Sequence, residues 1–583
     1  MAKTGTAFDF VLLKRVLRYV RPYRSIFYGT ILLTILSALL TPTRPWLIQY
    51  TLDNYILTFN ESGLINMTIV LIVLLIVEAI VQFFQTYFSN WLGQSVIKDI
   101  RVQLYQKIIS FKLKYFDKTP IGTLVTRSVS DLETIADIFS QGLLTIIGDL
   151  LQLFVVIVVM FYTDWKLTLV CLSSIPVLLL ATYIFKNAVK SAFQDVRTQV
   201  SRLNAFVQEH IIGMNVIQIF NRENEEFEKF KKINAQHRDA HIKSVWAYSI
   251  FFPIVEILSA MSLALLVWWG TKSAIDGSIT YGSLVAFILY IHMLFRPIRQ
   301  LADRFNVLQM GIVSSERVFR VIDTDSTIEN SGQQRANNIQ GNISFERVWF
   351  AYNDEDWVLK DISLDVKSGQ TIAFVGATGA GKTSIINILS RFYDYQKGQI
   401  KIDSYDIKEY QLQELRKNIG VVLQDVFLFS DTILNNITIK NPDISRERVI
   451  EAAKIVGAHK FIMQLPEGYD YNVRERGAML SAGQRQLIAF IRAYVYNPKI
   501  LVLDEATSSI DIESEQLIQK ATAKLTENRT SIIIAHRLAT IQKADKIVVL
   551  EKGEIVEQGN HQELLALDGQ YKKLYEIQFK QAV

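Results

Sequence analysis

The sequence has little of what several large classes of protein need. Its single cysteine, Cys171, cannot form a disulfide within the chain, which excludes a disulfide-rich fold. Only 27 glycines and 10 prolines occur among 583 residues, which excludes a collagen-like chain. With 20 % charged and 50 % hydrophobic residues the chain is not intrinsically disordered, and a net charge of +5 is too small to predict nucleic-acid binding. The length predicts at least two domains.

Hydrophobic residues gather in the first half of the chain, although the mean hydropathy of the whole chain is only +0.20. Six apolar stretches with few or no charges precede residue 300. Each reaches the roughly 18–20 residues that a helix needs to cross a bilayer. We therefore predict an all-α, six-helix transmembrane domain in residues 25–322. The predicted spans lie in Ser25–Thr43, Leu64–Ser89, Gln141–Thr163, Leu167–Phe185, Val245–Gly270 and Gly277–Phe295.

The placement of lysine and arginine predicts how the spans are oriented. The first 24 residues hold six basic residues, whereas Tyr50–Gly63 holds none. We therefore expect an integral membrane protein with both termini in the cytoplasm and without a cleavable signal peptide. Within residues 1–24, Leu13 and Val16 share one helical face while Lys14 and Arg18 lie on the other. This pattern predicts an interfacial (elbow) helix.

Two connections between the spans, Asn90–Ser140 and Lys186–Ser244, are long and hydrophilic. Unstructured loops of that length are rare, so each is predicted to form two helical limbs with a break near the middle. Pro120 and Gly122 mark the first break, and Gly213 marks the second. Limbs of about 20 residues would project about 30 Å below the membrane and end in turns that could contact a cytosolic domain.

The composition changes after residue 320. The polar segment 323–341 is typical of a linker. In residues 342–583 strand-like runs alternate with helical patterns, which predicts an α/β domain with a largely parallel sheet. The predicted strands include Thr371–Val375, Ile419–Leu423, Ile500–Leu503, Thr530–Ile534 and Lys546–Leu550.

The first of these strands runs into a phosphate-binding P-loop, Gly376–Thr383. Its glycines let backbone N–H groups approach phosphate oxygens, and the following helix N-terminus adds a positive field. Lys382 would reach the β- and γ-phosphates, and Thr383 would offer its hydroxyl to Mg²⁺. ATP and Mg²⁺ are therefore the predicted cofactors of a P-loop ATPase. The nucleotide-binding residues predicted here are Gly376, Ala377, Thr378, Gly379, Ala380, Gly381, Lys382, Thr383 and Ser384.

A pair of acids follows another strand-like run. Ile500–Leu503 is apolar throughout, as expected of a strand buried on both faces, and it leads directly into Asp504 and Glu505. In combination with a P-loop, Asp504 is placed to hold Mg²⁺ or its water. Glu505, one residue further on, could polarise the attacking water.

The segment Leu480–Gln486 resembles the ABC signature, usually written LSGGQ, and Ser481 lies 23 residues before Asp504. Residues 343–575 are accordingly similar to the nucleotide-binding domain of an ABC transporter. The resemblance implies that Ser481, Gly483 and Gln484 bind ATP. Ala482 stands where the motif has glycine, and its one additional methyl group is expected to have a weak effect.

The resemblance also assigns roles outside these motifs. It implies that Gln424 and His536 are catalytic with Glu505, and that Gln424 also senses Mg²⁺. Further positions implied by the resemblance are Tyr352 stacking on adenine, Asp511 in a segment that crosses between paired domains, and Glu475 and Arg476 meeting the membrane domain.

The whole chain resembles a half-size ABC exporter of the type IV class, akin to bacterial multidrug or lipid exporters. The family's two coupling turns fall at Phe116–Gly122 and Glu209–Gly213. The resemblance implies a dimer in the bacterial inner membrane that uses ATP to export or flip lipophilic or amphipathic molecules, or lipids, by alternating access. A homodimer is favoured over a heterodimer because Glu505 and His536 are both kept.

Two other functions remain open from the sequence. An ATP-gated channel or regulator could use the same fold, although the intact Glu505, His536, Lys382 and Gln424 disfavour it. A peptide exporter of the processing type would be expected to carry an N-terminal protease domain, and only about 24 residues precede the first predicted span. A heavy-metal exporter is disfavoured by the single cysteine.

Four ionisable residues fall within the predicted spans. These candidate cavity residues are Glu78, Asp149, Glu256 and His292. Ionisable groups in spans usually face a bundle interior or a water-filled cavity. Glu256 is the strongest candidate from position alone, and the acids favour cationic amphiphiles as substrates. Helix pairing or a place near the membrane interface would explain the same residues equally well.

Overall fold

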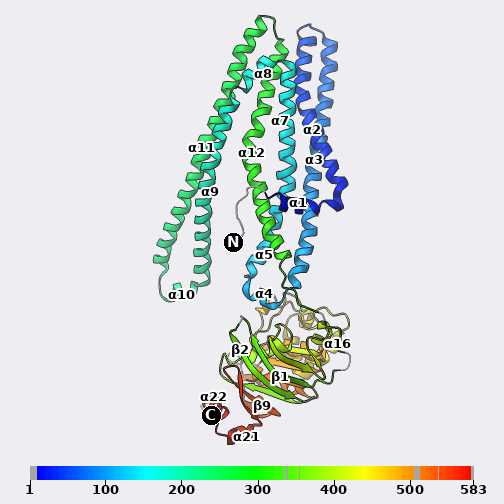
Figure 1. Cartoon of the computed structure of the whole chain (residues 1–583), viewed down its shortest axis with the longest axis vertical. Coiled ribbons are helices and arrows are strands. Elements are labelled where there is room, and N and C mark those ends of the chain that lie inside the picture. Colours follow the sequence, from blue (N-terminus) through cyan, green and yellow to red (C-terminus); the bar gives the residue numbers. More distant parts are fainter. Residues whose placement is uncertain are drawn as a thin grey trace. The chain divides into compact units, whose positions relative to one another are not determined.

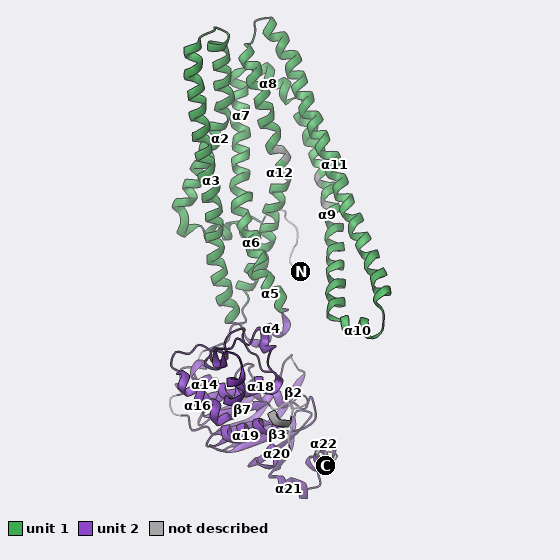
Figure 2. Cartoon of the chain, turned by 180° about the vertical axis from the view of Figure 1, so that it is seen from behind, with its two compact units in different colours: residues 1–109, 121–325 green, residues 110–120, 326–583 purple. Residues whose placement is uncertain are grey.

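The computed structural model describes residues 9–330, 332–336, 339–353, 355–504, 512–535 and 538–579. The chain divides into two compact units, drawn in different colours in Figure 2. Unit 1 comprises Met1–Ile109 and Ile121–Asp325, and unit 2 comprises Ser110–Pro120 and Ser326–Val583. The segment 110–120, which joins two helices of unit 1, therefore belongs to unit 2.

Unit 1 is helical throughout its regular structure in the described residues (Figure 1). Its longest helices follow the long apolar runs, because a helix satisfies its own backbone groups where lipid offers no hydrogen bonds. Prolines lie inside α2, α11 and α12. The helices are α1 (Phe10–Arg18), α2 (Arg24–Thr51), α3 (Glu61–Ile109), α5 (Ile121–Ser128), α6 (Ser130–Asp137), α7 (Leu143–Thr163), α8 (Trp165–Leu172), α9 (Ile175–Ile212), α10 (Met214–Ile219), α11 (Glu223–Ile275) and α12 (Tyr281–Ile322), with π-helical turns at Leu52–Ile56 and Ile138–Gly142.

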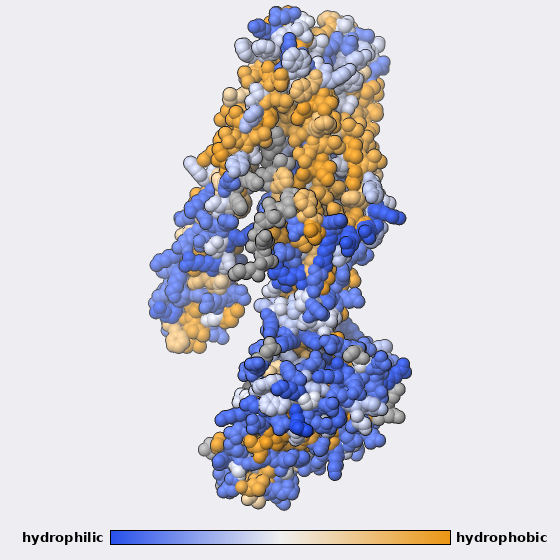
Figure 3. All heavy atoms as spheres, in the orientation of Figure 1, coloured by the Kyte–Doolittle hydropathy of each residue, from blue (hydrophilic) through white to orange (hydrophobic). Residues whose placement is uncertain are grey.

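Several of these helices are long and apolar enough to cross a membrane. Among the described residues five segments meet both conditions, and the apolar part of α12, Tyr281–Pro297, is shorter. In Figure 3 apolar side chains cover the middle of the unit 1 helices, while hydrophilic ones cover the lower parts of α9 and α11. The predicted helical membrane domain is confirmed. The segments that meet both conditions are Arg21–Ile56, Glu61–Ile109, Ile121–Thr163, Trp165–Ile212 and Glu223–Ile275.

The amphipathic N-terminal segment forms α1. The side chain of Asp9 caps it by accepting hydrogen bonds from the N–H groups of Val11 and Leu12 at 2.9 and 3.2 Å. Leu13 and Val16 are buried, as the helical pattern predicts. Arg15 forms a two-pronged ion pair with Asp323, with both N–O distances 2.6 Å, which ties α1 to the end of α12.

Unit 2 holds two sheets. A four-stranded antiparallel sheet has the order β2-β1-β4-β5, and a six-stranded sheet has the order β10-β9-β3-β8-β7-β6 with parallel pairing from β9 to β6. This is the predicted α/β domain with a largely parallel sheet. The strands are β1 (Ile343–Ala351), β2 (Trp357–Val366), β3 (Thr371–Val375), β4 (Lys397–Ile402), β5 (Tyr405–Asp406), β6 (Ile419–Val422), β7 (Ile500–Asp504), β8 (Thr530–Ile534), β9 (Lys546–Glu551) and β10 (Glu554–Gly559).

The parallel strands at the centre of the six-stranded sheet are buried on both faces. Along β3, Ile372 and Phe374 join one hydrophobic cluster while Ala373 and Val375 join another, so successive side chains serve opposite faces. This explains the unbroken apolar runs of the parallel strands. The helices of unit 2 are α4 (Leu113–Lys118), α13 (Lys382–Leu389), α14 (Leu412–Asn418), α15 (Ile433–Thr438), α16 (Arg446–Val456), α17 (His459–Gln464), α18 (Ala482–Tyr496), α19 (Ile512–Thr526), α20 (Leu538–Gln542), α21 (His561–Ala566) and α22 (Gln570–Phe579).

Candidate nucleotide site and coupling elements

The carboxyl ends of four parallel strands lie in register at one edge of the sheet. β6 pairs Val422 with Leu503 of β7, β7 pairs Asp504 with Ile534 of β8, and β8 pairs Ile534 with Phe374 of β3. In open α/β sheets, ligands bind outside this edge. The segments that leave these strands are the ones that hold the predicted Gln424, the acid pair, the predicted switch histidine and the P-loop.

The P-loop departs from β3 through glycines that no larger residue could replace. A Cβ on Gly376, where φ is +154°, would lie 2.3 Å from the carbonyl oxygen of Leu550. A Cβ on Gly381, where φ is +102°, would lie 2.7 Å from Cδ2 of Leu359. Gly381 is also the N-cap of α13, and Lys382 is the first residue of that helix. The loop therefore keeps its backbone open to an approaching phosphate, as the sequence pattern predicts.

The charges of Lys382, at the start of α13, and Asp504, at the end of β7, act on each other. The ammonium group of Lys382 donates hydrogen bonds to the carbonyl oxygens of Gly376 and Ala377, at 2.7 and 3.0 Å. Burial lowers the pKa of Lys382, and the charge of Asp504 opposes that shift. Burial raises the pKa of Asp504, which Lys382 opposes and Asp425 reinforces. A cation bound beside Asp504 would offset the cost of burying its charge.

The predicted metal-binding residues supply the donors that Mg²⁺ prefers. Thr383 offers a hydroxyl, Asp504 a carboxylate and Gln424 an amide oxygen, all hard oxygen ligands. Asp504 is only 6 % exposed at the end of β7, whereas Thr383 and Gln424 are exposed. This donor set fits a magnesium ion that keeps several waters.

Tyr352, predicted to stack on adenine, is half-buried beside α13. Its hydroxyl lies 3.1 Å from Oγ of Ser384 and accepts a 2.9 Å hydrogen bond from the side-chain amide of Asn387. The ring of Tyr393 meets the ring of Tyr352 edge-on, with centroids 4.9 Å apart and an interplanar angle of 86°. Tyr352 is thus fixed by its hydroxyl and its ring edge.

Tyr393 also contacts the segment Ser110–Pro120, which we call the first turn. Its hydroxyl donates a hydrogen bond to the carboxylate of Asp117. Burial and this contact raise the pKa of Tyr393, so its hydroxyl stays protonated in neutral solution. Lys112 of the same segment pairs with Asp394 at 3.2 Å and donates its backbone N–H to Ser326 at 2.7 Å. Pro120 ends this segment and Gly122 follows two residues later, and both are exposed.

The sequence did not single out Tyr393. A tyrosine after a helix carries no special signal by itself, and its partner Asp117 lies 276 positions earlier in the chain. Only its two contacts, with the ring of Tyr352 and the carboxylate of Asp117, place it between the predicted adenine platform and a predicted coupling element.

The signature segment begins α18. Ser481 is the N-cap: its Oγ accepts from the N–H of Gln484 at 3.2 Å, and Oε1 of Gln484 accepts from the N–H of Ser481 at 3.0 Å. Gly483 is buried, whereas Ser481 and Ala482 are exposed. The predicted nucleotide-binding residues of this segment therefore lie at an exposed helix N-terminus, where an anion is favoured.

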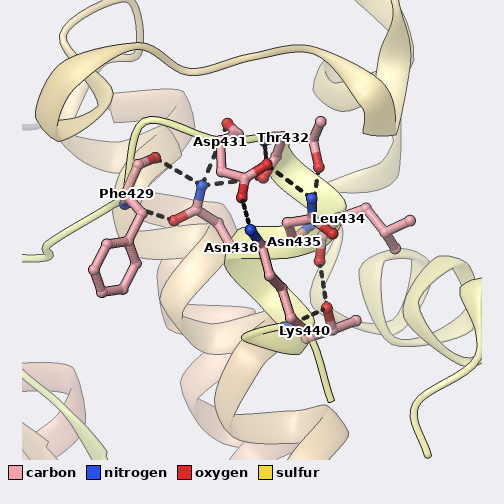
Figure 4. A network of polar contacts seen from close by, with 8 residues as sticks. Phe429, Asp431, Thr432, Leu434, Asn435, Asn436 and Lys440 are labelled. Carbon is pink, nitrogen blue, oxygen red and sulfur yellow. Dashed lines mark hydrogen bonds and ion pairs between the residues drawn. The ribbon is translucent and has the colours of Figure 1, made fainter. Parts of the chain in front are cut away.

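A polar network lies in the segment after Gln424, between Phe429 and Lys440 (Figure 4). Asp431 accepts hydrogen bonds from the backbone of Thr432 and the amide of Asn435, at 2.8 and 2.7 Å, and pairs with Lys440 at 2.8 Å. These donors lower the pKa of Asp431 to about 2, with the Asn435 amide contributing most. The carbonyl oxygen of Asp431 in turn accepts from the N–H of Val473 at 3.1 Å.

The same network is anchored by a buried amide. Asn436, which is 1 % exposed, accepts from the N–H of Phe429 at 2.8 Å and donates to its carbonyl at 3.0 Å. Phe429 itself is exposed. Glu475 and Arg476, predicted to meet the membrane domain, follow in an exposed 3₁₀ turn in which Arg476 has φ +52°.

The segment Ile211–Phe220, which we call the second turn, lies in unit 1 and contains α10. Gly213 separates α9 from α10, and its N–H donates to the carbonyl of Glu209 at 2.8 Å. Its large apolar side chains other than Ile217 are exposed, with Ile212 at 77 % and Ile219 at 74 %. In Figure 3 the apolar colour returns at this tip.

The four ionisable residues of the spans separate in the structure. Glu78 and Asp149 line one cavity of unit 1, and Asp149 pairs with Arg304 at 3.0 Å. Glu256 and His292 are exposed in this chain and do not line that cavity. The pairing of Asp149 escaped prediction because Arg304 is 155 positions away on another helix. The predicted residues Glu505, Asp511 and His536 lie outside the described residues.

An apolar helical domain joined to a P-loop domain with an acid at the end of a buried parallel strand defines an ATP-hydrolysing membrane transporter. Two family models match the chain: "ABC transporter transmembrane region" over residues 27–298 and "ABC transporter" over residues 359–508. The chain belongs to the ABC transporter family.

Relatives match almost the whole chain. The uncharacterized ABC transporter ATP-binding protein YknV of Bacillus subtilis is 38% identical over 579 residues, which is 99% of this chain and 96% of that protein. A protein of Staphylococcus aureus, provisionally named a multidrug export ATP-binding/permease protein, is 38% identical over 576 residues, 97% of this chain and 100% of its own. The predicted family and its ATPase-coupled transport are thereby confirmed.

Proposed function

We propose that this protein is a homodimeric exporter in the bacterial inner membrane, with both termini in the cytoplasm. It would use ATP to export or flip lipophilic or amphipathic small molecules, or lipids, by alternating access. The observation that carries the ATPase part is the register of β6, β7, β8 and β3, whose carboxyl ends meet at one edge of the sheet. The provisional multidrug-export name of the S. aureus relative supports the direction of transport.

At the nucleotide site each group has a proposed task. The N–H groups of Gly376–Thr383 and the ammonium of Lys382 bind the phosphates, and Tyr352 stacks on adenine, with the Asp511 segment adjoining the nucleotide. Thr383, Asp504 and Gln424 hold Mg²⁺, which neutralises charge on the phosphates. Glu505 takes a proton from the attacking water, Gln424 orients that water, and His536 contacts the γ-phosphate.

The proposal requires two chains. One chain carries one P-loop and one exposed signature serine, Ser481, so each ATP would lie between the P-loop of one chain and the signature of the other. The second turn supports this arrangement, because its apolar side chains are left exposed in a single chain. We propose that the second turn docks on the ATPase domain of the second copy.

Closure of the two ATPase domains would move the membrane helices through the turns. ATP favours the closed state because both chains contact its γ-phosphate, and differential binding of this kind shifts a two-state equilibrium. In the first turn, a continuous set of contacts runs from Tyr352 through Tyr393 to Asp117. We propose that this set, together with Pro120, Gly122, Gly213, Glu475 and Arg476, couples nucleotide occupancy to the spans.

The test is transport by purified protein in sealed vesicles, with ATP supplied on the side of the ATPase domains. Wild-type protein is expected to accumulate a lipophilic dye against its gradient. Glu505→Gln is expected to bind ATP with unchanged affinity and to lose hydrolysis by about 10²–10⁴-fold, the contribution of a general base.

Two outcomes would contradict the proposal in different ways. Normal turnover by Glu505→Gln would remove Glu505 from its role as base. ATP hydrolysis by wild-type protein that opens a passive pathway, without uphill transport, would instead favour a channel or regulator. Gel filtration and an ATPase assay of the protein purified alone test the homodimer. ATPase activity that appears only with a second, different chain would refute it.

A further inference from the structure

The cavity between α2, α3, α7 and α12 differs from an ordinary hydrophobic drug pocket. It encloses about 540 Å³ and follows α2 from Thr30 to Arg44, about 21 Å at the rise of an α-helix. Ligand pockets are mostly lined by apolar and aromatic side chains. Here most lining side chains carry hydroxyl, amide or charged groups, although α2, α3 and α7 lie in segments that are long and apolar enough to span a membrane.

The charged groups of the cavity are not all neutralised. It is lined by three arginines, Arg44, Arg296 and Arg304, and two acids, Glu78 and Asp149. The Nε of Arg304 lies 3.0 Å from Oδ2 of Asp149, so these two charges offset each other. Among the residues that the structure describes, no ion pair involves Arg44, Arg296 or Glu78. Within the described residues the cavity thus presents two guanidinium groups and one carboxylate that form no direct ion pair, although the charge of Arg296 also acts on Asp149.

Neutral hydrogen-bonding groups surround these charges. The amide of Gln85 donates to the hydroxyl of Thr34 at 3.1 Å, and that hydroxyl donates to the carbonyl of Thr30 at 2.8 Å. Arg304 donates to the amide oxygen of Gln300 at 2.6 Å. Charges at membrane depth are costly and mark a functional surface when they face a cavity. A headgroup with its own charges and hydrogen-bonding groups complements this lining, and an apolar molecule does not.

An aromatic groove continues from the cavity along α3. The groove measures about 780 Å³ and shares the lining residues Ala79, Gln82 and Thr86 with the cavity. Its other side chains include Phe83 and Tyr87, whose rings stack with centroids 6.3 Å apart. Both rings are largely exposed in this chain. A polar chamber beside an aromatic groove matches a molecule with a charged head and an apolar tail.

We infer that the cavity binds the headgroup of a zwitterionic amphiphile and that the groove takes its tail. An anionic phosphate or carboxylate group is held by Arg44 and Arg296, and the ammonium group is held by Glu78. Asp149 and Arg304 line the cavity as an ion pair and do not bind the charged groups of the ligand. The role of this binding in transport rests on the proposed export function, but the binding itself needs no ATP.

The experiment compares three probes that share one tail: hexadecylphosphocholine, hexadecyl phosphate and hexadecyltrimethylammonium. Binding of each radiolabelled probe is measured without ATP, below its micellar concentration, to full-length protein in phosphatidylglycerol nanodiscs. Hexadecylphosphocholine is expected to bind at least tenfold more tightly than either singly charged probe. If added phosphatidylethanolamine competes with the probe, a membrane lipid is the source of the headgroup. If it does not compete, the ligand is a free amphiphile.

Single substitutions then separate the two charges. Arg296→Gln is expected to weaken hexadecylphosphocholine about tenfold and to spare the cationic probe. Glu78→Gln is expected to weaken hexadecylphosphocholine about tenfold and to spare the anionic probe. Arg238→Gln, an exposed residue on α11 paired with Asp239, is the matched control and should change none of the three. Glu256→Gln tests the exposed surface of α11 as an alternative.

Several outcomes would overturn the inference. They are equal binding of the three probes, no effect of Arg296→Gln and Glu78→Gln, or loss of binding in Glu256→Gln alone. Tyr87→Ala should weaken the hexadecyl probe more than its octyl analogue; a change in dimer formation instead would assign the groove to the second copy. Selective binding without ATP-driven uptake would keep the inference and refute the export function.

Discussion

Each of the two turns lies within one of the long connections between spans, but the two differ in what surrounds them. The first turn belongs to unit 2, where Asp117 and Lys112 contact Tyr393 and Asp394. The second turn belongs to unit 1, and its large apolar side chains are exposed. Polar contacts hold the first turn on its own chain, whereas the second turn has an apolar surface suited to association.

The difference indicates that the two turns do different work in the proposed dimer. Contacts within a chain form during folding and are present whether or not a second copy is bound. An exposed apolar tip gains stability only when a partner covers it. Loss of the first turn should therefore impair communication within a chain, and loss of the second should impair function that depends on two chains.

The largest effect is expected in the second turn. Ile212→Asp places a charge on a side chain that is 77 % exposed in one chain, so the chain should still fold. Covering that charge in a dimer costs about 2 kcal/mol or more, so transport and cooperative ATPase activity should fall by at least tenfold. Vesicle transport and thermal unfolding of the same preparation check both parts.

Gln208→Asp, exposed on α9 close to the same tip, supplies a matched control. It should leave transport within twofold of wild type. Equal losses in both variants would mean that any charge on the limb is harmful and would remove the special role of the apolar tip.

A smaller effect is expected in the first turn. Tyr393→Phe keeps the ring against Tyr352 and removes the hydrogen bond to Asp117, which costs about 1 kcal/mol. ATP binding should be unchanged, and the number of molecules transported per ATP should fall about threefold to tenfold. A fall in ATP affinity with unchanged coupling would make Tyr393 a support for Tyr352 only.

Removing the ion pair of the first turn should matter less. Lys112 and Asp394 lie 3.2 Å apart and are partly exposed, and pairs of this kind contribute about 0–1 kcal/mol. Lys112→Gln should lower coupling less than twofold, and raising the salt concentration should abolish its difference from wild type. A salt-independent loss comparable to that of Tyr393→Phe would show that Lys112 acts through something other than this pair.

The smallest effect is expected for Ala482→Gly. This substitution changes the ATPase domain but neither turn, so it gives a baseline for the comparison. Ala482→Gly restores the glycine of the family motif at the first position of α18 and should destabilise that helix by up to about 1 kcal/mol. ATPase activity should stay within about threefold of wild type, with an unchanged ratio of transport to hydrolysis. A changed ratio would show that coupling also responds to the signature helix.

Local pattern was sufficient for much of the fold. The P-loop strand was predicted as Thr371–Val375 and forms β3 with those bounds, because an apolar run ending in glycine leaves few alternatives. The predicted Ile500–Leu503 and Ile419–Leu423 differ from β7 and β6 by one residue each. Strand ends depend on where pairing stops, which no single strand determines.

Contacts between segments that are distant in the chain could not be predicted from the sequence. Asp149 was recognised as an ionisable residue in a span, but its partner Arg304 lies on α12, which four further helices separate from α7 along the chain. The same limit applies to Tyr393, whose contact with Asp117 decides its surroundings. Glu256 was the strongest cavity candidate by position, yet position along a helix does not fix which face meets a cavity, and Glu256 is exposed in this chain.

The N-cap of α18 has one more consequence. When Oγ of Ser481 accepts the N–H of Gln484, the bond uses a lone pair and leaves the hydroxyl hydrogen free to be donated. The same oxygen that caps the helix is thus held in place at an exposed helix end, with a hydrogen still to donate. Much of the entropy of ordering this side chain is lost when the domain folds, so less of it would oppose the proposed binding of a phosphate oxygen.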